Sequence, residues 1–291
     1  MIYTVSHRTT YRYADPVAIS HHLLHLAPRG GAWQRCRDWA LEIDPPPSVR
    51  RDDRDYFGNP VTFLTIQQSH RELVLHASSS VEVRRPEPVD PGRTPTVGEI
   101  RERLARAREN DALSALEFTF PSLYAPFEPA LAAWAAPSFP PERPFLEAAA
   151  ELSARIHREF RYDPRATTVA TPVAEAFRLR RGVCQDFAHL AIACLRALGL
   201  PARYVSGYLR TRPRDGGTRL TGADASHAWL AVWIPELGWF DLDPTNDLVV
   251  GEEHVTVAWG RDYGDVAPVS GTLFGGGRHT VEVAVDVVPA E

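Results

Sequence analysis

Residues 181–198, RGVCQDFAHLAIACLRAL, decide how the rest of the chain is interpreted. From Phe187 onward, apolar residues recur every three to four positions, which is the spacing of an amphipathic helix. Gly199 and Pro201 follow, and together they predict that the helix ends there. Cys184 therefore stands at the predicted start of a helix, where unpaired backbone amides and the helix dipole favour a thiolate and can hold a carbonyl oxygen.

Cys184 has to be compared with the other two cysteines. A lone cysteine is usually a small buried hydrophobic residue, and Cys194, which lies mid-helix among Ala and Leu, fits that description. We expect the same of Cys36. Asp186 complicates the case for Cys184, because a carboxylate in the first turn stabilises the helix but would disfavour a thiolate if it pointed at the sulfur.

A histidine and an aspartate follow on two consecutive predicted strands. The first strand spans residues 227–234 and begins with His227, and the second spans 238–243 and ends with Asp243, directly before Pro-Thr. A cysteine at a helix start, a histidine on a strand and an aspartate on the next strand are the components of a thiol–imidazole–carboxylate triad. Singly, the histidine could be a core residue bonded to backbone and the aspartate a turn residue.

The two strands are expected to form an antiparallel hairpin. A turn centred on Pro235 would make His227 and Asp243 direct cross-strand neighbours, since each lies eight residues from it, with Cβ atoms roughly 5 Å apart. In that register Asp241 would face Trp229. A turn over residues 235–238 would shift the register and would need a bulge to restore the contact.

Three blocks of this sequence resemble a known family. RGVCQDFA around Cys184, SHAW around His227 and GWFDLDPT around Asp243 are similar to the motifs of the bacterial transglutaminase-like superfamily, and most of all to its branch of candidate cysteine proteases. The resemblance covers residues 145–250. The first 85 residues, with their YFGNP turn, more loosely resemble the β-rich domain that precedes this core in bacteria.

The resemblance implies an α+β fold with a papain-like core, in which a helix carrying the cysteine packs on an antiparallel sheet carrying the histidine and the aspartate. It also implies roles: Cys184 as nucleophile, His227 as general base and acid, and Asp243 as the group that orients the imidazole. The family includes proteases, amidases, transglutaminases and inactive relatives, so it implies a protein or peptide substrate without fixing the reaction. No counterpart of the animal enzymes' calcium sites is found, so we expect no metal and no cofactor.

Two other functions stay open at this stage. Arylamine N-acetyltransferases also approach a catalytic cysteine through an Arg-Gly-rich segment, but their cysteine lies in the first third of the chain, whereas Cys184 lies past the middle. A catalytically silent binding module is the other possibility. In that case the β-rich domain would recruit a partner and the core would be a scaffold.

Working outward, the chain divides into four parts. Residues 1–85 alternate in the manner of strands, residues 86–144 are Pro-rich with short helices, residues 145–250 form the expected catalytic core, and residues 251–291 add C-terminal strands that complete the fold.

The composition of the chain argues against several classes of protein. The 291 residues carry a formal net charge of −5, and every basic residue is Arg, which argues against nucleic acid as the main partner. There is no apolar run of the roughly 18 residues that a membrane helix needs, so no membrane association is expected. We see no signal peptide and no disulfide framework, which predicts a cytoplasmic protein. The oligomeric state is not predicted.

Overall fold

The first sheet is built around one long strand, β1 (Ile2–Leu24), whose side chains alternate between buried and more exposed positions. The first half of β1 pairs with β5 on one side and β14 on the other, and its second half pairs with β4 and β13. All of these pairings are antiparallel. Besides β1, the seven-stranded sheet contains β2 (Gln34–Asp44), β3 (Val49–Arg54), β4 (Pro60–Ile66), β5 (His70–Val83), β13 (Val269–Gly275) and β14 (His279–Pro289).

The second sheet is the part that positions the candidate site. It has five strands in the order β11-β10-β9-β8-β12 and is antiparallel. A separate short parallel pair joins β6 to β7. The strands are β6 (Arg161–Tyr162), β7 (Arg181–Gly182), β8 (Ala202–Leu209), β9 (Ser226–Ile234), β10 (Gly238–Asp243), β11 (Leu248–Val249) and β12 (His254–Gly260).

Helices cover one face of the second sheet, where α6 and α4 pack against β9 and α6 also packs against β8. The helix α6 is buried almost throughout because its apolar residues face both the sheet and the neighbouring helices. The α-helices are α1 (Val97–Ala105), α2 (Asn110–Glu117), α3 (Pro129–Ala135), α4 (Phe145–Glu159), α5 (Val173–Leu179), α6 (Cys184–Ala197) and α7 (Tyr263–Val266), and the 3-10 turns are Pro91–Arg93 and Ala136–Ser138.

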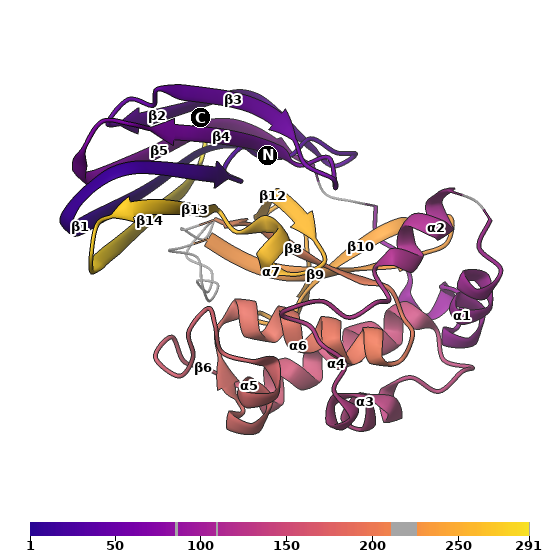
Figure 1. Ribbon diagram of the computed structural model, residues 1–291. Helices are drawn as coiled ribbons and strands as arrows, with labels where there is room; N and C mark the ends of the chain where they lie inside the picture. Colours follow the sequence, from indigo (N-terminus) through magenta and orange to yellow (C-terminus); the bar gives the residue numbers. More distant parts are fainter. Residues whose placement is uncertain (85–86, 109, 211–225, 291) are drawn as a thin grey trace.

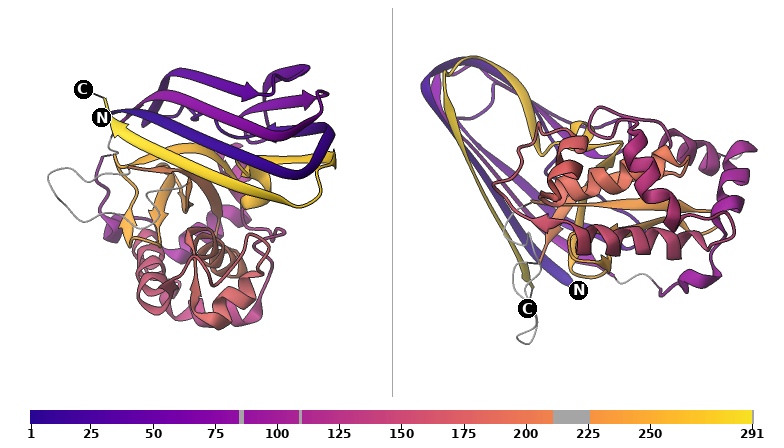
Figure 2. Two further views of the ribbon diagram at one scale, coloured as in Figure 1. Left: turned by 90° about the vertical axis from the view of Figure 1, so that its left-hand side faces the viewer. Right: turned by 90° about the horizontal axis from the view of Figure 1, so that it is seen from below.

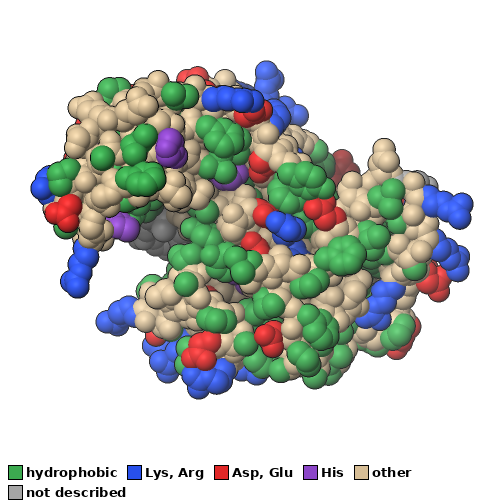
Figure 3. Space-filling model, viewed as in Figure 1, with side chains coloured by type: hydrophobic (Ala, Val, Ile, Leu, Met, Phe, Trp, Pro, Cys, Tyr) green, Lys and Arg blue, Asp and Glu red, His purple; other side chains and the backbone are tan. Residues whose placement is uncertain are grey.

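The computed structural model thus has three layers: the long N-terminal sheet, the five-stranded sheet, and the helices (Figure 1). The two sheets meet where β12 and β8 approach β5 and β14. The ends of the chain lie side by side, since the Ala290 amide donates to the Ile2 carbonyl at 2.8 Å (Figure 2). The face seen in Figure 3 is hollowed between the sheet above and the helices below.

The expected fold class is confirmed: an α+β core follows a β-rich N-terminal region. The C-terminal residues are shared between the two sheets, because β12 joins the core sheet whereas β13 and β14 return to the N-terminal one. The sequence predicts C-terminal strands over residues 251–291, and the structure has β12, β13 and β14 in that range.

The structure describes residues 1–84, 87–108, 110–210 and 226–290. The polar, Gly-rich stretch 212–224, whose composition predicts a loop, lies outside these ranges. Within the described part of the chain, no helix is both long enough and apolar enough to cross a bilayer.

Candidate active site

Cys184 is the first residue of α6, as the sequence predicts, and its side chain is buried. The chain enters the helix through β7, which pairs with β6 so that Tyr162 lies beside Gly182. Just before β7, Arg180 adopts a left-handed conformation with φ of 52°, which turns the chain into the strand. A thiol placed this way lies beside the unpaired amides of the first helical turn.

The Asp186 carboxylate turns back over the start of the helix. Its Oδ2 accepts hydrogen bonds from the Val183 amide at 2.8 Å and from the Thr167 hydroxyl at 2.6 Å. Burial raises the pKa of Asp186 above its ordinary value, and these two hydrogen bonds oppose the rise. The carboxylate therefore caps the helix. It is not free to point at the Cys184 sulfur, where it would disfavour a thiolate.

His227 and Asp243 are in direct contact and fully buried. The Nε2 of His227 donates to the Asp243 Oδ2 at 2.8 Å. The other ring nitrogen, Nδ1, has no hydrogen-bond partner of ordinary geometry among the described residues, so it is the nitrogen open to the Cys184 thiol.

The charges around this imidazole favour its protonated form. Burial alone would lower the pKa of His227, but the charges of Asp243 and Cys184, together with the hydrogen bond to Asp243, raise it to about 10. In turn, although burial would raise the pKa of Asp243, the charge of His227 and the bonds to it hold that pKa well below its usual range. The three side chains are thus electrostatically coupled, in the sense that a thiolate–imidazolium pair requires.

The predicted hairpin register is wrong by one step. Trp239 faces Trp233 and Leu242 faces Leu230, so the hairpin is centred on Glu236 and not on Pro235. If this register is extended, Asp243 lies two residues out of line with His227. The hydrogen bond between the two side chains is therefore made diagonally across the strands, without a bulge. The cause is a three-residue loop, in which the Leu237 amide donates to the Ile234 carbonyl at 3.2 Å and Glu236 has φ of 65°.

Asp241 takes a structural position on the same strand. It faces Ala231 and not Trp229 as predicted, although its Oδ2 accepts a hydrogen bond from the Trp229 indole at 2.9 Å. Burial raises its pKa, opposed by the nearby Arg203. Arg203 is itself buried, and its guanidinium lies over the rings of Trp239 and Trp259. Asp241 therefore belongs to a partly buried cluster of Arg203 and tryptophan rings, and not to the His227 contact.

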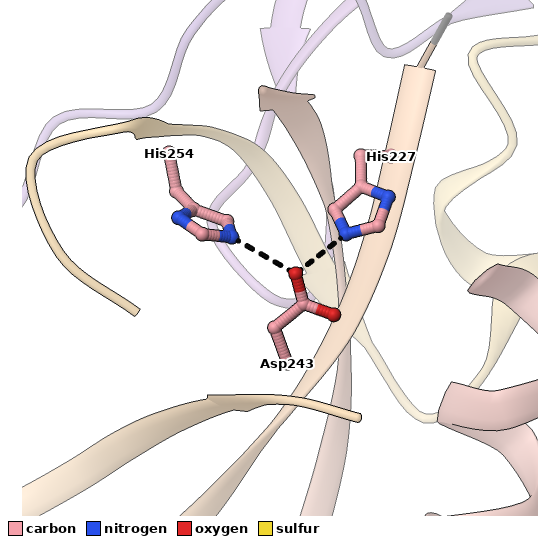
Figure 4. Close-up of side chains that lie close together, drawn as sticks. All are labelled: His227, Asp243 and His254. Carbon is pink, nitrogen blue, oxygen red and sulfur yellow. Dashed lines mark hydrogen bonds and ion pairs between the residues drawn. The ribbon is translucent and has the colours of Figure 1, made fainter. Parts of the chain in front are cut away.

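Two further side chains bind the Asp243 carboxylate and were not predicted. The Nε2 of His254, at the start of β12, donates to Oδ2 at 3.2 Å (Figure 4). The side-chain amide of Asn246 donates through Nδ2 to the same oxygen at 2.7 Å. The sequence signal for His254 is weak, namely a histidine opening the alternating strand HVTVAW in the C-terminal segment.

His227, Asp243 and His254 also bring potential metal ligands together, with their ligand atoms within 4.8 Å of one another. The Asp243 oxygen can accept hydrogen bonds but not donate them. With both contacts at hydrogen-bond distance, each Nε2 carries hydrogen and donates it to the carboxylate. The arrangement is that of a hydrogen-bonded carboxylate.

The three cysteines are free thiols. Burial raises the pKa of Cys194 to about 12 and also raises that of Cys36. Near Cys184, Tyr162 is affected too, because burial and the charge of Cys184 raise its pKa to about 12. Cys194 is buried as expected, whereas Cys36 is only half-buried and is not the core residue that the sequence predicts. Both are thiols of raised pKa against which Cys184 can be compared.

Comparison with known proteins matches the region that contains Cys184, His227 and Asp243 to a known family. Residues 3–82 match the family model described as the bacterial transglutaminase-like N-terminal region, and residues 133–244 match the model of the transglutaminase-like superfamily. An uncharacterized protein of Mycobacterium tuberculosis is 43% identical over 99% of this chain and 93% of its own length. A protein-glutamine gamma-glutamyltransferase of Pseudomonas aeruginosa is 35% identical over 32% of this chain and 15% of its own.

Among solved structures, a Cytophaga hutchinsonii protein described as a candidate cysteine protease superimposes with a TM-score of 0.77. The match covers 100% of this chain and 92% of the other, at 22% sequence identity. At that identity the similarity shows the fold, including the N-terminal sheet. The chemistry has to be inferred from the residues of this chain.

Proposed function

Since this chain belongs to the transglutaminase-like superfamily, we propose that it is a thiol enzyme in which Cys184, His227 and Asp243 act as a catalytic triad on amides of proteins or peptides. The observation that carries the proposal is the buried His227–Asp243 hydrogen bond of 2.8 Å, on an imidazole whose pKa also responds to the charge of Cys184. A buried carboxylate that orients such an imidazole is the arrangement that activates a nucleophile.

In the proposed mechanism, His227 Nδ1 takes the thiol proton and the Cys184 thiolate attacks the amide carbonyl. The oxyanion is held by the backbone amides at the start of α6, and one such donor typically contributes roughly 3 kcal/mol to transition-state stabilisation. The imidazolium then returns the proton to the leaving amine or ammonia, and a thioester on Cys184 remains. Water or a second amine resolves the thioester and regenerates the thiol.

The test is the rate of Cys184 alkylation by iodoacetamide from pH 4 to 9, read by mass spectrometry. At pH 6.5 only about one in a hundred ordinary thiols is ionised. We expect Cys184 to react at least tenfold faster than that fraction allows, and far faster than Cys36 and Cys194. His227→Ala should remove the advantage. Equal behaviour of Cys184 in the two proteins, at the rate of an ordinary thiol, would contradict the proposal.

Hydrolysis and transamidation are the two outcomes of the same acyl-enzyme, and a second assay separates them. A glutamine-containing protein is incubated with the enzyme and a fluorescent primary amine. Incorporation of the amine indicates transamidation, whereas ammonia or peptide release without incorporation indicates hydrolysis. Cys184→Ala is the control in both cases, because it removes the nucleophile and should abolish either activity.

A further inference from the structure

A second imidazole shares the Asp243 oxygen with His227. Figure 4 shows the two rings approaching Oδ2 from different sides, with Nε2 to Oδ2 distances of 2.8 Å for His227 and 3.2 Å for His254. The rings come from different strands, β9 and β12, which lie on either side of β8. The mechanism proposed above uses His227 and gives His254 no task, although the side chain of His254 is almost entirely buried.

Geometry fixes the protonation state of His254. Its Nε2 must carry hydrogen because the carboxylate oxygen can accept but not donate. Its Nδ1 is buried and has no hydrogen-bond partner within the described ranges, so a second hydrogen there would be an unpaired buried donor. The ring is therefore neutral. Burial lowers the pKa of His254 in agreement, opposed by Asp243 and Asp241 and assisted by the charge of His227.

His254 is one of several donors on this carboxylate. Oδ2 accepts hydrogen bonds from His227, His254 and Asn246, and Oδ1 accepts from the backbone amides of Thr245 at 2.9 Å and Asn246 at 3.3 Å. Asp243 therefore keeps its position if His254 is lost. What His254 adds is a donor on the very oxygen that orients His227, which draws part of the negative charge away from the imidazole.

We propose that His254 is a positioning residue for His227: its neutral ring donates Nε2–H to Asp243 Oδ2, completes the cradle of that carboxylate and moderates its pull on the imidazole. This inference rests on the proposed function, since it concerns the same triad. The consequence is chemical. A carboxylate with fewer donors would hold the imidazolium more tightly, and His227 would return its proton to the leaving group less readily.

The test compares His254→Phe with His254→Gln. Phenylalanine keeps a ring but removes the donor, whereas the Gln side-chain amide carries a donor at nearly the position of Nε2. In His254→Phe the imidazolium is more stable, so the half-maximal rate of Cys184 alkylation should move to lower pH by about one unit. His254→Gln should stay close to the native profile. Coincident profiles for the native protein and His254→Phe, or a shift to higher pH, would overturn the inference.

A measurement on the native protein covers the case in which His254→Phe does not fold. Long-range nitrogen–proton spectra of the histidine rings should show His254 neutral, with hydrogen on Nε2 and a bare Nδ1, from pH 5 to 9. Hydrogen on Nδ1 in that range would overturn the inference.

The two hypotheses fail in different ways. If native Cys184 alkylates as an ordinary thiol, the proposed function fails, while the spectra still test His254 as the donor. If native Cys184 is activated and the His254→Phe profile is unchanged, the triad stands and the role of His254 is rejected.

Discussion

Gly182 leaves the space into which the Asp186 carboxylate folds. A Cβ atom at residue 182 would lie 2.5 Å from Asp186 Oδ2 and 2.8 Å from its Cβ, closer than atoms can approach. The carboxylate would have to leave the Val183 amide that it caps. Since Cys184 follows directly, the glycine contributes to the placement of the nucleophile.

Gly182→Ala should therefore lower the free energy of unfolding by about 1–3 kcal/mol and slow Cys184 alkylation at neutral pH. Gly199→Ala is the matched control at the other end of α6. It meets no atom within 4 Å, but Gly199 has φ of 72°, so alanine there should cost about 1 kcal/mol of backbone strain. Urea unfolding and alkylation rates would be measured for both. Slower alkylation in Gly199→Ala, or an unchanged rate in Gly182→Ala, would contradict the prediction.

At the residue scale, the sequence could single out the cysteine, the histidine and the aspartate as candidates because each lies in a distinctive local pattern. Asn246 lies three residues beyond Asp243. Polar residues are expected in the turn after the strand, so nothing distinguished Asn246 as a partner of the carboxylate. His254 could not be found, because its contact with Asp243 depends on β12 pairing with β8, and that pairing joins His254 to Leu209. Local pattern contains no information about such a distant partner.

At the scale of elements, the hairpin of β9 and β10 was predicted within one residue at each boundary, yet its register was not. Strand limits follow from the alternation of apolar residues, and that alternation is the same for either of the two turns considered. Register follows from turn geometry, and here Pro235 precedes a residue with positive φ, as in a type II turn. Glu is an uncommon residue for that conformation, so no residue in the turn indicates it.

The strain at Glu236 can be measured. Its φ is 65°, a conformation that Asn tolerates better than Glu. Glu236→Asn should raise the free energy of unfolding by about 0.5 kcal/mol. Glu236→Gln keeps the strain and removes the exposed ion pair with Arg103 at 2.9 Å, so it should change stability by less than about 0.5 kcal/mol. Equal stabilities for Glu236→Asn and Glu236→Gln in urea unfolding would show that the turn stores no such strain.

At the scale of the molecule, residues of the N-terminal region form hydrogen bonds with β12, the strand that carries His254. The Gln34 side chain donates to the Thr256 carbonyl at 2.7 Å and accepts from the Thr256 amide at 2.8 Å. Asn59, in the YFGNP turn, accepts from the Trp259 amide at 3.0 Å and donates to its carbonyl at 2.8 Å. Both contacts are on β12. The sequence identified this turn but could not show its partner, which lies 200 residues away.

The interface also contains a buried histidine. On β1, His7 bonds to the Tyr208 hydroxyl of β8 through Nδ1 at 2.8 Å and to Thr9 through Nε2 at 3.0 Å. Burial, assisted by the charge of His76, lowers the pKa of His7 from 6.5 to about 4. In the unfolded chain the ring takes up a proton near pH 6.5, while in the folded protein it stays neutral down to about pH 4. Its contribution to stability is therefore complete above pH 6.5 and is lost as the pH falls towards 4.

We expect the unfolding free energy of the native protein to fall between pH 7 and 4.5 by about 2 kcal/mol more than that of His7→Asn. Asparagine keeps a polar group near Nδ1 but does not titrate. Tyr208→Phe is the control, because it removes the hydroxyl bond and leaves His7 to titrate. It should be less stable at pH 7 and show the native slope. The other buried histidines titrate equally in all three proteins, so their effect cancels in the comparison. Parallel curves for the native protein and His7→Asn would mean that His7 does not make the contact between the sheets sensitive to acid.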